Sequence, residues 1–88
     1  DFLSLSFQYY FYIKAEHIPG VMSSITSMFA EKKVGIASIL QQEDIKENMV
    51  PIVLITDPFV ESDHKDLVTN ILNLDSVNEV RSIRIESD

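Results

Sequence analysis

The strongest constraint on the fold is the order in which strand-like and helix-like stretches follow one another along the 88 residues. Apolar and polar side chains alternate over residues 9–15, a period that predicts a strand. Ile18-Pro19-Gly20 then breaks the alternation, because proline fixes φ and suits the start of a helix. Apolar residues recur at helical spacing over 21–33, which predicts an amphipathic helix of roughly thirteen residues that Gly35 ends.

The second half of the chain continues with two strands, a helix and a final strand. Residues 36–43 predict a second strand, and the apolar run 50–56 predicts a third. Ser62 or Asp63 is expected to cap a second amphipathic helix. Residues 80–86 predict the last strand.

These elements give the order βαββαβ, which is typical of an α+β, ferredoxin-like sandwich. Right-handed crossovers place the first and third strands in the middle of a four-stranded antiparallel sheet, in the order 4-1-3-2, with both helices on one face. We assign residues 9–88 to this one domain. Residues 1–8 alternate separately and predict a linker or a strand from a preceding domain.

The two faces of the predicted sheet differ in what we expect to cover them. Ile83 and Ile85 of the last strand are expected to face inward, toward the helices. Tyr10 and Tyr12 are expected to face away from the helices. They either stabilise the open sheet face as an aromatic pair or meet a partner.

The charge and the composition exclude several classes of function. Seven Lys and Arg against 14 Asp and Glu give a formal charge of −7, which repels nucleic-acid phosphates and an anionic membrane surface. The longest stretch without a charged residue, 2–13, is too short to span a membrane. The absence of Cys excludes disulfides and thiolate metal sites, and it fits a cytoplasmic protein.

No catalytic or metal-binding constellation stands out in the sequence. An RNA-binding domain of this plan needs a basic, aromatic sheet, and a copper chaperone needs a CxxC motif. An acylphosphatase-like enzyme needs an arginine in the loop after the first strand, which here reads Glu16-His17-Ile18-Pro19-Gly20. His17 and His64 lie far apart in the sequence and are interpreted as surface histidines.

Two features point instead to binding. The N–H groups at the start of the first helix offer a place for a carboxylate, although Pro19-Gly20 also fits a simple tight turn. Residues 34–42 carry no charge, whereas exposed edge strands are usually guarded by charge. We therefore expect strand 36–42 to pair with a second copy of the chain, or to be covered by another domain.

The ordered set of motifs carries a family resemblance over residues 9–86. It consists of Tyr9-Tyr10-Phe11-Tyr12-Ile13-Lys14, Ile18-Pro19-Gly20-Val21-Met22, Ile25-Thr26, Phe29 and the runs 35–43, 50–56 and 83–86. This set resembles an ACT domain, a small regulatory module that binds amino acids. In its later runs it is similar to the C-terminal ACT domain of the bacterial homoserine dehydrogenase family.

The resemblance implies a function for a larger protein. The parent enzyme would use NAD(P)H to reduce aspartate semialdehyde to homoserine, and its catalytic domain would precede this chain. The present chain would then hold no cofactor and no catalytic residue, and would bind threonine as a feedback effector. The alternatives are an ACT domain of another biosynthetic enzyme, or a structural dimerisation module without an effector.

The resemblance also implies where an effector binds, between the loop before the first helix and the second strand, at a dimer interface. The implied site residues are His17, Ile18, Pro19, Gly20, Val21, Met22, Ala37, Ser38, Ile39 and Gln41. The backbone of Gly20 and Val21 would hold the carboxylate, and Gln41 or Ser38 would meet the amino or hydroxyl group. The sequence departs from the family at His17, where an acidic residue is usual, and at Asp57, where histidine is common.

Overall fold

The computed structural model describes residues 5–42 and 48–86, and the account below refers to these residues. The predicted order of strands and helices is confirmed, and a two-residue strand is added before the second helix. The elements are β1 Ser6–Glu16, α1 Val21–Glu31, β2 Ile36–Gln41, β3 Met49–Thr56, β4 Phe59–Val60, α2 Glu61–Leu72 and β5 Val77–Ile85.

The strands form one antiparallel sheet in which β1 is central. β3 and β5 pair with the two sides of β1, and β2 pairs with the far side of β3. Because β4 is an added strand, β5 corresponds to the predicted fourth strand. Read from that edge, the observed order β5-β1-β3-β2 is the predicted order 4-1-3-2, so the ferredoxin-like topology is confirmed. The short β4 pairs with Ser6 and Phe7 at the beginning of β1. A two-residue strand has no usable periodicity, which explains why the sequence did not reveal it.

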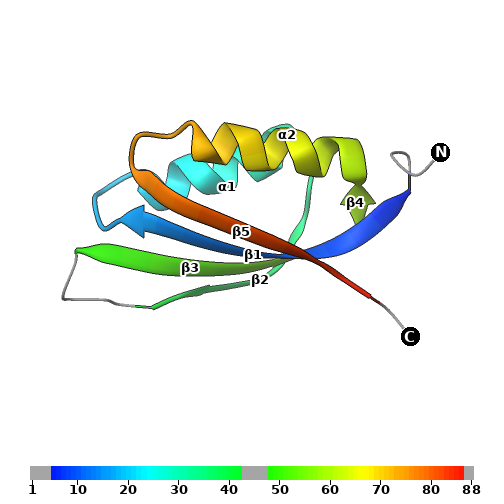
Figure 1. Ribbon diagram of the computed structural model, residues 1–88, viewed down its shortest axis with the longest axis horizontal. Coiled ribbons are helices and arrows are strands. Elements are labelled where there is room, and N and C mark those ends of the chain that lie inside the picture. The colour runs from blue at the N-terminus through cyan, green and yellow to red at the C-terminus, as the bar shows by residue number, and fades with distance from the viewer. Residues whose placement is uncertain (1–4, 43–47, 87–88) are drawn as a thin grey trace.

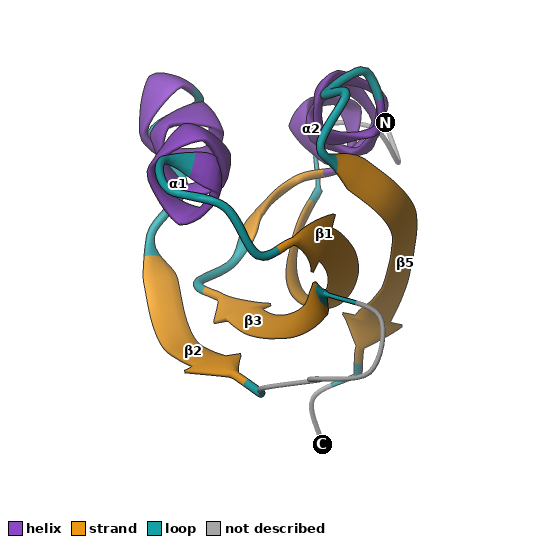
Figure 2. Ribbon diagram, turned by 90° about the vertical axis from the view of Figure 1, so that its left-hand side faces the viewer, coloured by secondary structure: helices purple, strands orange, loops and turns teal. Residues whose placement is uncertain are grey.

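Both helices lie on one face of the sheet, and nothing in the described chain covers the other face (Figure 1). Figure 2 shows α1 above the β2 side and α2 above the β5 side. β1 directs alternate side chains into the layer between sheet and helices. The core there combines buried residues of β1, β3 and both helices: Tyr9, Phe11, Ile13, Ala15, Ile25, Phe29, Ile52, Leu54, Leu67 and Ile71.

The end of α1 differs from the prediction. The helix stops at Glu31, and the left-handed conformation that ends it is taken by Lys33, with φ 58°, rather than by Gly35. Gly35 lies beside Asp57 instead: a Cβ placed on Gly35 would come within 2.2 Å of Asp57 Oδ2. Lys32, the residue after the helix, reaches across to α2 and lies 3.0 Å from Asp66 Oδ2.

The start of α2 also differs from the prediction. The helix begins at Glu61, and Val60 occupies the capping position without a side-chain hydrogen bond. Ser62 and Asp63 therefore lie inside the helix and do not cap it. Glu61 and Asp63 place carboxylates in the first turn, where the helix dipole favours negative charge.

β5 turns its side chains the opposite way from the prediction. Ser82, not Ile83, faces the helices, and its hydroxyl meets His64 of α2. Ile83 pairs directly with Tyr10 and is 63% exposed on the face away from the helices. Ile85 shares that side by alternation. A shift of one residue exchanges the two faces of a strand, and β5 is too mixed in polarity for its sequence to decide between them.

The beginning of β1 extends the strand beyond its predicted start. β1 runs continuously from Ser6, so residues 6–8 belong to the same strand as Tyr9. The assignment of residues 1–8 to a linker and 9–88 to the domain stays a prediction. Neither described helix is long and apolar enough to cross a membrane.

Lys33 provides a test of the helix end. Its side chain is exposed, and an L-residue at φ 58° is strained where glycine is not. We expect Lys33→Gly to unfold with a free energy about 0.5–1 kcal/mol higher than Lys33→Ala, which removes the same charge but keeps a Cβ. Chemical denaturation of the two variants measures the difference. Equal stability would show that the left-handed residue does not limit this turn.

Candidate functional site

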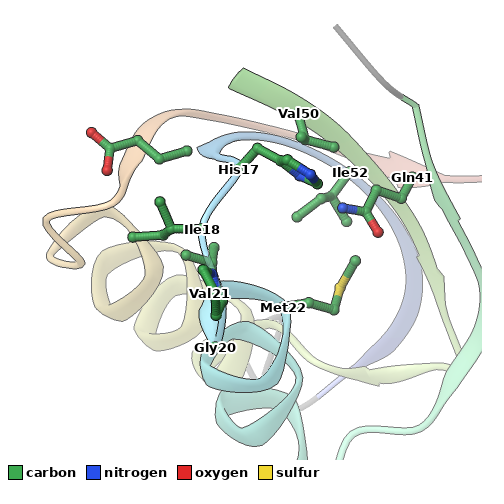
Figure 3. A pocket seen from close by; sticks show the side chains of 10 residues that line it. His17, Ile18, Gly20, Val21, Met22, Gln41, Val50 and Ile52 are labelled. Carbon is green, nitrogen blue, oxygen red and sulfur yellow. The ribbon is translucent and has the colours of Figure 1, made fainter. Parts of the chain in front are cut away.

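A cavity of about 260 Å³ lies between the start of α1 and the strands β2 and β3. Its wall is formed by the loop after β1, the first turn of α1 and four residues of the sheet (Figure 3). The lining residues are Glu16, His17, Ile18, Pro19, Gly20, Val21, Met22, Gln41, Val50 and Ile52. A ligand of drug size needs roughly 300–1,000 Å³, so this cavity suits a smaller molecule.

The loop that carries most of these residues is held by the backbone. The N–H of Glu16 donates to the carbonyl of Ser76 at 2.8 Å, and the N–H of His17 donates to the carbonyl of Asn48 at 3.0 Å. Gly20 then occupies the residue before α1 with φ 88°, a conformation that side chains rarely adopt. No atom lies within 4 Å of the place where a Cβ would be. Glycine is therefore favoured at residue 20 because of the positive φ angle, and not because a side chain would lack space.

The first turn of α1 can receive an anion. The N–H groups at a helix start have no partner within the helix, and the first turn of α1 contains no acidic side chain that would compete for them. The N–H of Val21 points to the carbonyl of Ile18 at 3.5 Å, which is the long limit of a hydrogen bond. A carboxylate can therefore replace this contact at small cost.

The opposite wall combines one polar side chain with apolar ones. Gln41 of β2 pairs directly with Ile52 of β3, so the two side chains share the face that looks toward the helices. Val50 and Ile52 are buried, and Met22 is half-buried at the start of α1. Figure 3 shows His17 beside Ile52 and Gln41 on one side of the cavity, with Val21 and Met22 of α1 on the other. The cavity thus combines the N–H groups at the start of α1, which can receive an anion, with the side-chain amide of Gln41 and the apolar surface of Val50 and Ile52.

The structure brings seven of the ten predicted site residues to this cavity: His17, Ile18, Pro19, Gly20, Val21, Met22 and Gln41. Ala37, Ser38 and Ile39 do not line it. They are exposed along β2, the edge strand of the sheet, and the register of β2 against β3 shifts between Ile36 and Ser38. Their role in binding stays a prediction that a single chain does not test.

Sequence reasoning missed three lining residues, Glu16, Val50 and Ile52. Val50 and Ile52 could have been found from the alternation in β3, because they lie on the same side as Leu54. Glu16 is the last residue of β1, and no pattern in the sequence marks it as part of a cavity.

A second polar cluster lies on the helix-facing side of the sheet and was not expected. The ring of His64 stacks on Tyr9 with centroids 3.9 Å apart, and its Nε2 lies 2.7 Å from Ser82 Oγ. The single hydroxyl hydrogen of Ser82 is donated to the carbonyl of Tyr10, so Nε2 of His64 must be the donor to Ser82. The interpretation of His64 as a surface histidine is wrong, because only 15% of its side chain is exposed. His17 is exposed, as expected.

The other ring nitrogen of His64 faces a carboxylate. Nδ1 is buried without a hydrogen bond, 3.4 Å from Glu61 Oε1, and Glu61 also accepts a hydrogen bond from the Tyr9 hydroxyl. Burial lowers the pKa of His64 below its usual value, and the nearby Glu61 carboxylate opposes this only in part. Burial and the Glu61 hydrogen bond raise the pKa of Tyr9. The cluster ties β1, α2 and β5 together.

Within residues 5–42 and 48–86, no group of three or more His, Asp or Glu side chains is placed to hold a metal ion. The first turn of α2, with its carboxylates, is accordingly explained by the helix dipole and by the contacts with Lys32 and His64.

Comparison with known sequences links the chain to one enzyme. The chain is 31% identical over 80 residues to the homoserine dehydrogenase of Pseudomonas aeruginosa, covering 89% of this chain and 18% of that enzyme. It is 38% identical over 72 residues to the homoserine dehydrogenase of Bacillus subtilis, covering 78% of this chain and 16% of that enzyme. The chain thus spans less than a fifth of the length of these relatives. No family model matches the sequence.

Comparison with solved structures gives the same result. A homoserine dehydrogenase from Thiobacillus denitrificans superposes with a TM-score of 0.83 and 28% identity, over 97% of this chain and 19% of that one. The ACT domain of a GTP pyrophosphokinase from Chlorobium tepidum superposes with a TM-score of 0.70 over 89% of this chain and 99% of that domain, and its 19% identity shows the fold alone. The ACT-like fold and the resemblance to homoserine dehydrogenase are confirmed.

The shifted pKa of His64 predicts how stability depends on pH. The unfolded chain takes up a proton on this side chain near pH 6.5, whereas the folded chain resists protonation to a lower pH. The stability that the neutral ring contributes is therefore complete above pH 6.5 and is lost as the pH falls below that value. We expect the free energy of unfolding of the natural chain to decrease as the pH falls below 6.5. Denaturant titration at several pH values measures this decrease.

His64→Gln provides the control for this prediction, because its amide can still bond to Ser82 but does not titrate. The pH dependence between 7.5 and 5.5 should be smaller in this variant. His17→Gln replaces an exposed histidine outside this cluster and is the matched comparison. The interpretation is overturned if the two variants behave alike.

Proposed function

We propose that this chain is the amino-acid-binding regulatory ACT domain of a homoserine dehydrogenase. The observation that carries the proposal is the cavity in which the start of α1 faces Gln41 across an apolar floor. An amino acid needs a place for its carboxylate, polar contacts for its other groups and a surface for its side chain. The cavity offers all three within a volume suited to a small ligand.

The proposed ligand is threonine, placed by the chemistry of its groups. Its carboxylate would accept hydrogen bonds from the backbone N–H groups of Gly20 and Val21 at the start of α1. Its hydroxyl would meet the side-chain amide of Gln41, which can donate and accept. Its methyl group would contact Ile52 and Val50, which are buried beside Gln41.

His17 distinguishes the proposed site from that of the family in how it would hold the amino group of the ligand. Where the family usually has an acidic residue, the His17 ring is exposed and lines the cavity. A neutral imidazole can accept a hydrogen bond from an ammonium group, whereas a protonated one would repel it. The amino group of the ligand would therefore be held less strongly here than by a carboxylate.

The parent protein follows from the same proposal. We propose that the longer protein reduces aspartate semialdehyde to homoserine with NAD(P)H, and that the cofactor and the reaction belong to a catalytic domain outside this chain. The identity shared with the homoserine dehydrogenases of Pseudomonas aeruginosa and Bacillus subtilis supports this. Binding of threonine in the ACT domain would then regulate an early step on the route to threonine itself.

Titration calorimetry of the 88-residue chain with threonine tests the site. We expect binding, weakened about fivefold by Gln41→Ala, because one net hydrogen bond is worth about 1 kcal/mol. Gln42→Ala is the matched control, since Gln42 is exposed and does not line the cavity. Valine, which replaces the hydroxyl by a methyl group, should bind more weakly than threonine. Absence of heat for threonine and for every other amino acid would overturn the proposal.

A second candidate function, a dimerisation module, is favoured by the edge of the sheet at β2. β2 pairs with β3 on one side and with no described strand on the other. Its described residues carry no charge, and Ile39 and Leu40 are 44% and 55% exposed. Such an edge is open to pairing with the same strand of a second copy, related by a two-fold axis.

Analytical ultracentrifugation at micromolar concentration tests pairing through β2. We expect the natural chain to associate and Ile39→Lys to weaken that association, because two lysines would approach at the paired edges. Leu72→Lys is the control, since Leu72 is 49% exposed but lies at the end of α2, away from β2. Association that is insensitive to Ile39→Lys would place the interface elsewhere.

A further inference from the structure

The side chain of His17 is a titratable group in the wall of the cavity. Figure 3 shows its ring beside Gln41, across the cavity from Val21 and Met22 of α1. The backbone of this residue is fixed, because its N–H donates to the carbonyl of Asn48 at 3.0 Å. The ring itself is exposed, so a proton reaches it from the solvent. Protonation of His17 thus changes the charge at a defined place in the cavity.

Few charged side chains surround His17. Glu16 is the one acidic residue that lines the cavity, and the lining residues of α1, β2 and β3 are all uncharged. Lys14 of β1 lies by alternation on the face of the sheet away from the helices, and Asp75 of the turn before β5 does not line the cavity. A glutamate side chain keeps its charge between pH 5.5 and 7.5. The charge of the lining that changes in this range is therefore that of His17.

The start of α1 sets the orientation of a bound amino acid. The carboxylate of the ligand would accept hydrogen bonds from the N–H groups of Gly20 and Val21. The same helix end repels the ammonium group, because it carries a partial positive charge. The ammonium group would therefore turn toward the opposite side of the cavity, where the His17 ring and the side-chain oxygen of Gln41 can accept hydrogen bonds.

We propose that His17 makes amino-acid binding in this cavity dependent on pH, so that the site holds its ligand at neutral pH and releases it more readily as the pH falls. The inference rests on the proposed function of the cavity. A neutral imidazole accepts a hydrogen bond from the ammonium group, whereas the protonated ring has no free lone pair and carries a like charge. By linkage, the bound ligand opposes protonation of His17 to the same extent.

Titration calorimetry of the 88-residue chain with threonine at pH 7.5 and pH 5.5 tests the proposal. The ammonium and carboxylate groups of threonine keep their charges over this range, so a change in affinity reports on the protein. We expect binding about fivefold weaker at pH 5.5, roughly the effect of two like charges about 4 Å apart in water. Binding of β-hydroxybutyrate, which is threonine without its amino group, should not weaken on acidification.

Substitutions at the two histidines separate the cavity from the buried cluster. His17→Gln does not titrate, so its affinity for threonine should be equal at the two pH values. His17→Asp should bind threonine more tightly than the natural chain at pH 5.5, and equally at both pH values, because a carboxylate stays charged and pairs with the ammonium group. His64→Gln is the matched control: His64 does not line the cavity, so this variant should keep the fivefold change.

The outcomes distinguish this inference from the proposed function. Equal affinity of the natural chain for threonine at both pH values would overturn the role of His17 and leave the amino-acid site in place. A pH dependence that persists in His17→Gln, that disappears in His64→Gln or that β-hydroxybutyrate shares would do the same. If no amino acid binds at pH 7.5, the proposed function and the inference both fail.

Discussion

The pairing of β1 with a strand on each side is the interaction on which the structure depends. Residues 10–15 are paired with both β3 and β5, so the central strand sets the positions of its two neighbours. Its alternation places Tyr9, Phe11 and Ile13 in the core and Tyr10 and Tyr12 on the face away from the helices. Its last residue also begins the loop that lines the cavity. A one-residue slip of this strand would exchange both faces and displace the loop.

The sequence was sufficient to predict those features of the fold that rest on a long stretch of a single periodicity. The order of elements and strands followed from periodicity and from the handedness of crossovers, and both are confirmed. It failed where a single backbone angle or a buried polar contact decides the outcome. Lys33 takes a left-handed conformation that its side chain does not favour, and His64 is buried because it stacks on Tyr9. Neither depends on a repeating pattern, so neither could be predicted.

The candidate site was predictable to the extent that it is local. Residues 17–22 are contiguous, so any turn between β1 and α1 brings them together. Gln41 was placed across from them by resemblance, and the structure shows why it reaches the cavity, since its partner Ile52 faces the same side. Ala37, Ser38 and Ile39 belong to the edge of the sheet, where a second copy would have to supply the other wall. Under the proposed pairing through β2, a second copy would bring its own residues beside them.

β2 connects the cavity to the surfaces of the sheet. Gln41 lines the cavity, Ile39 lies at the exposed edge, and Leu40 between them lies on the face away from the helices. A ligand that bridges Gln41 and the start of α1 would restrict the position of this strand. Any change in the affinity between copies that follows from ligand binding must appear equally as a change in ligand affinity on assembly. Under the proposed function, the edge strand would therefore carry the effect of a bound amino acid to a paired copy.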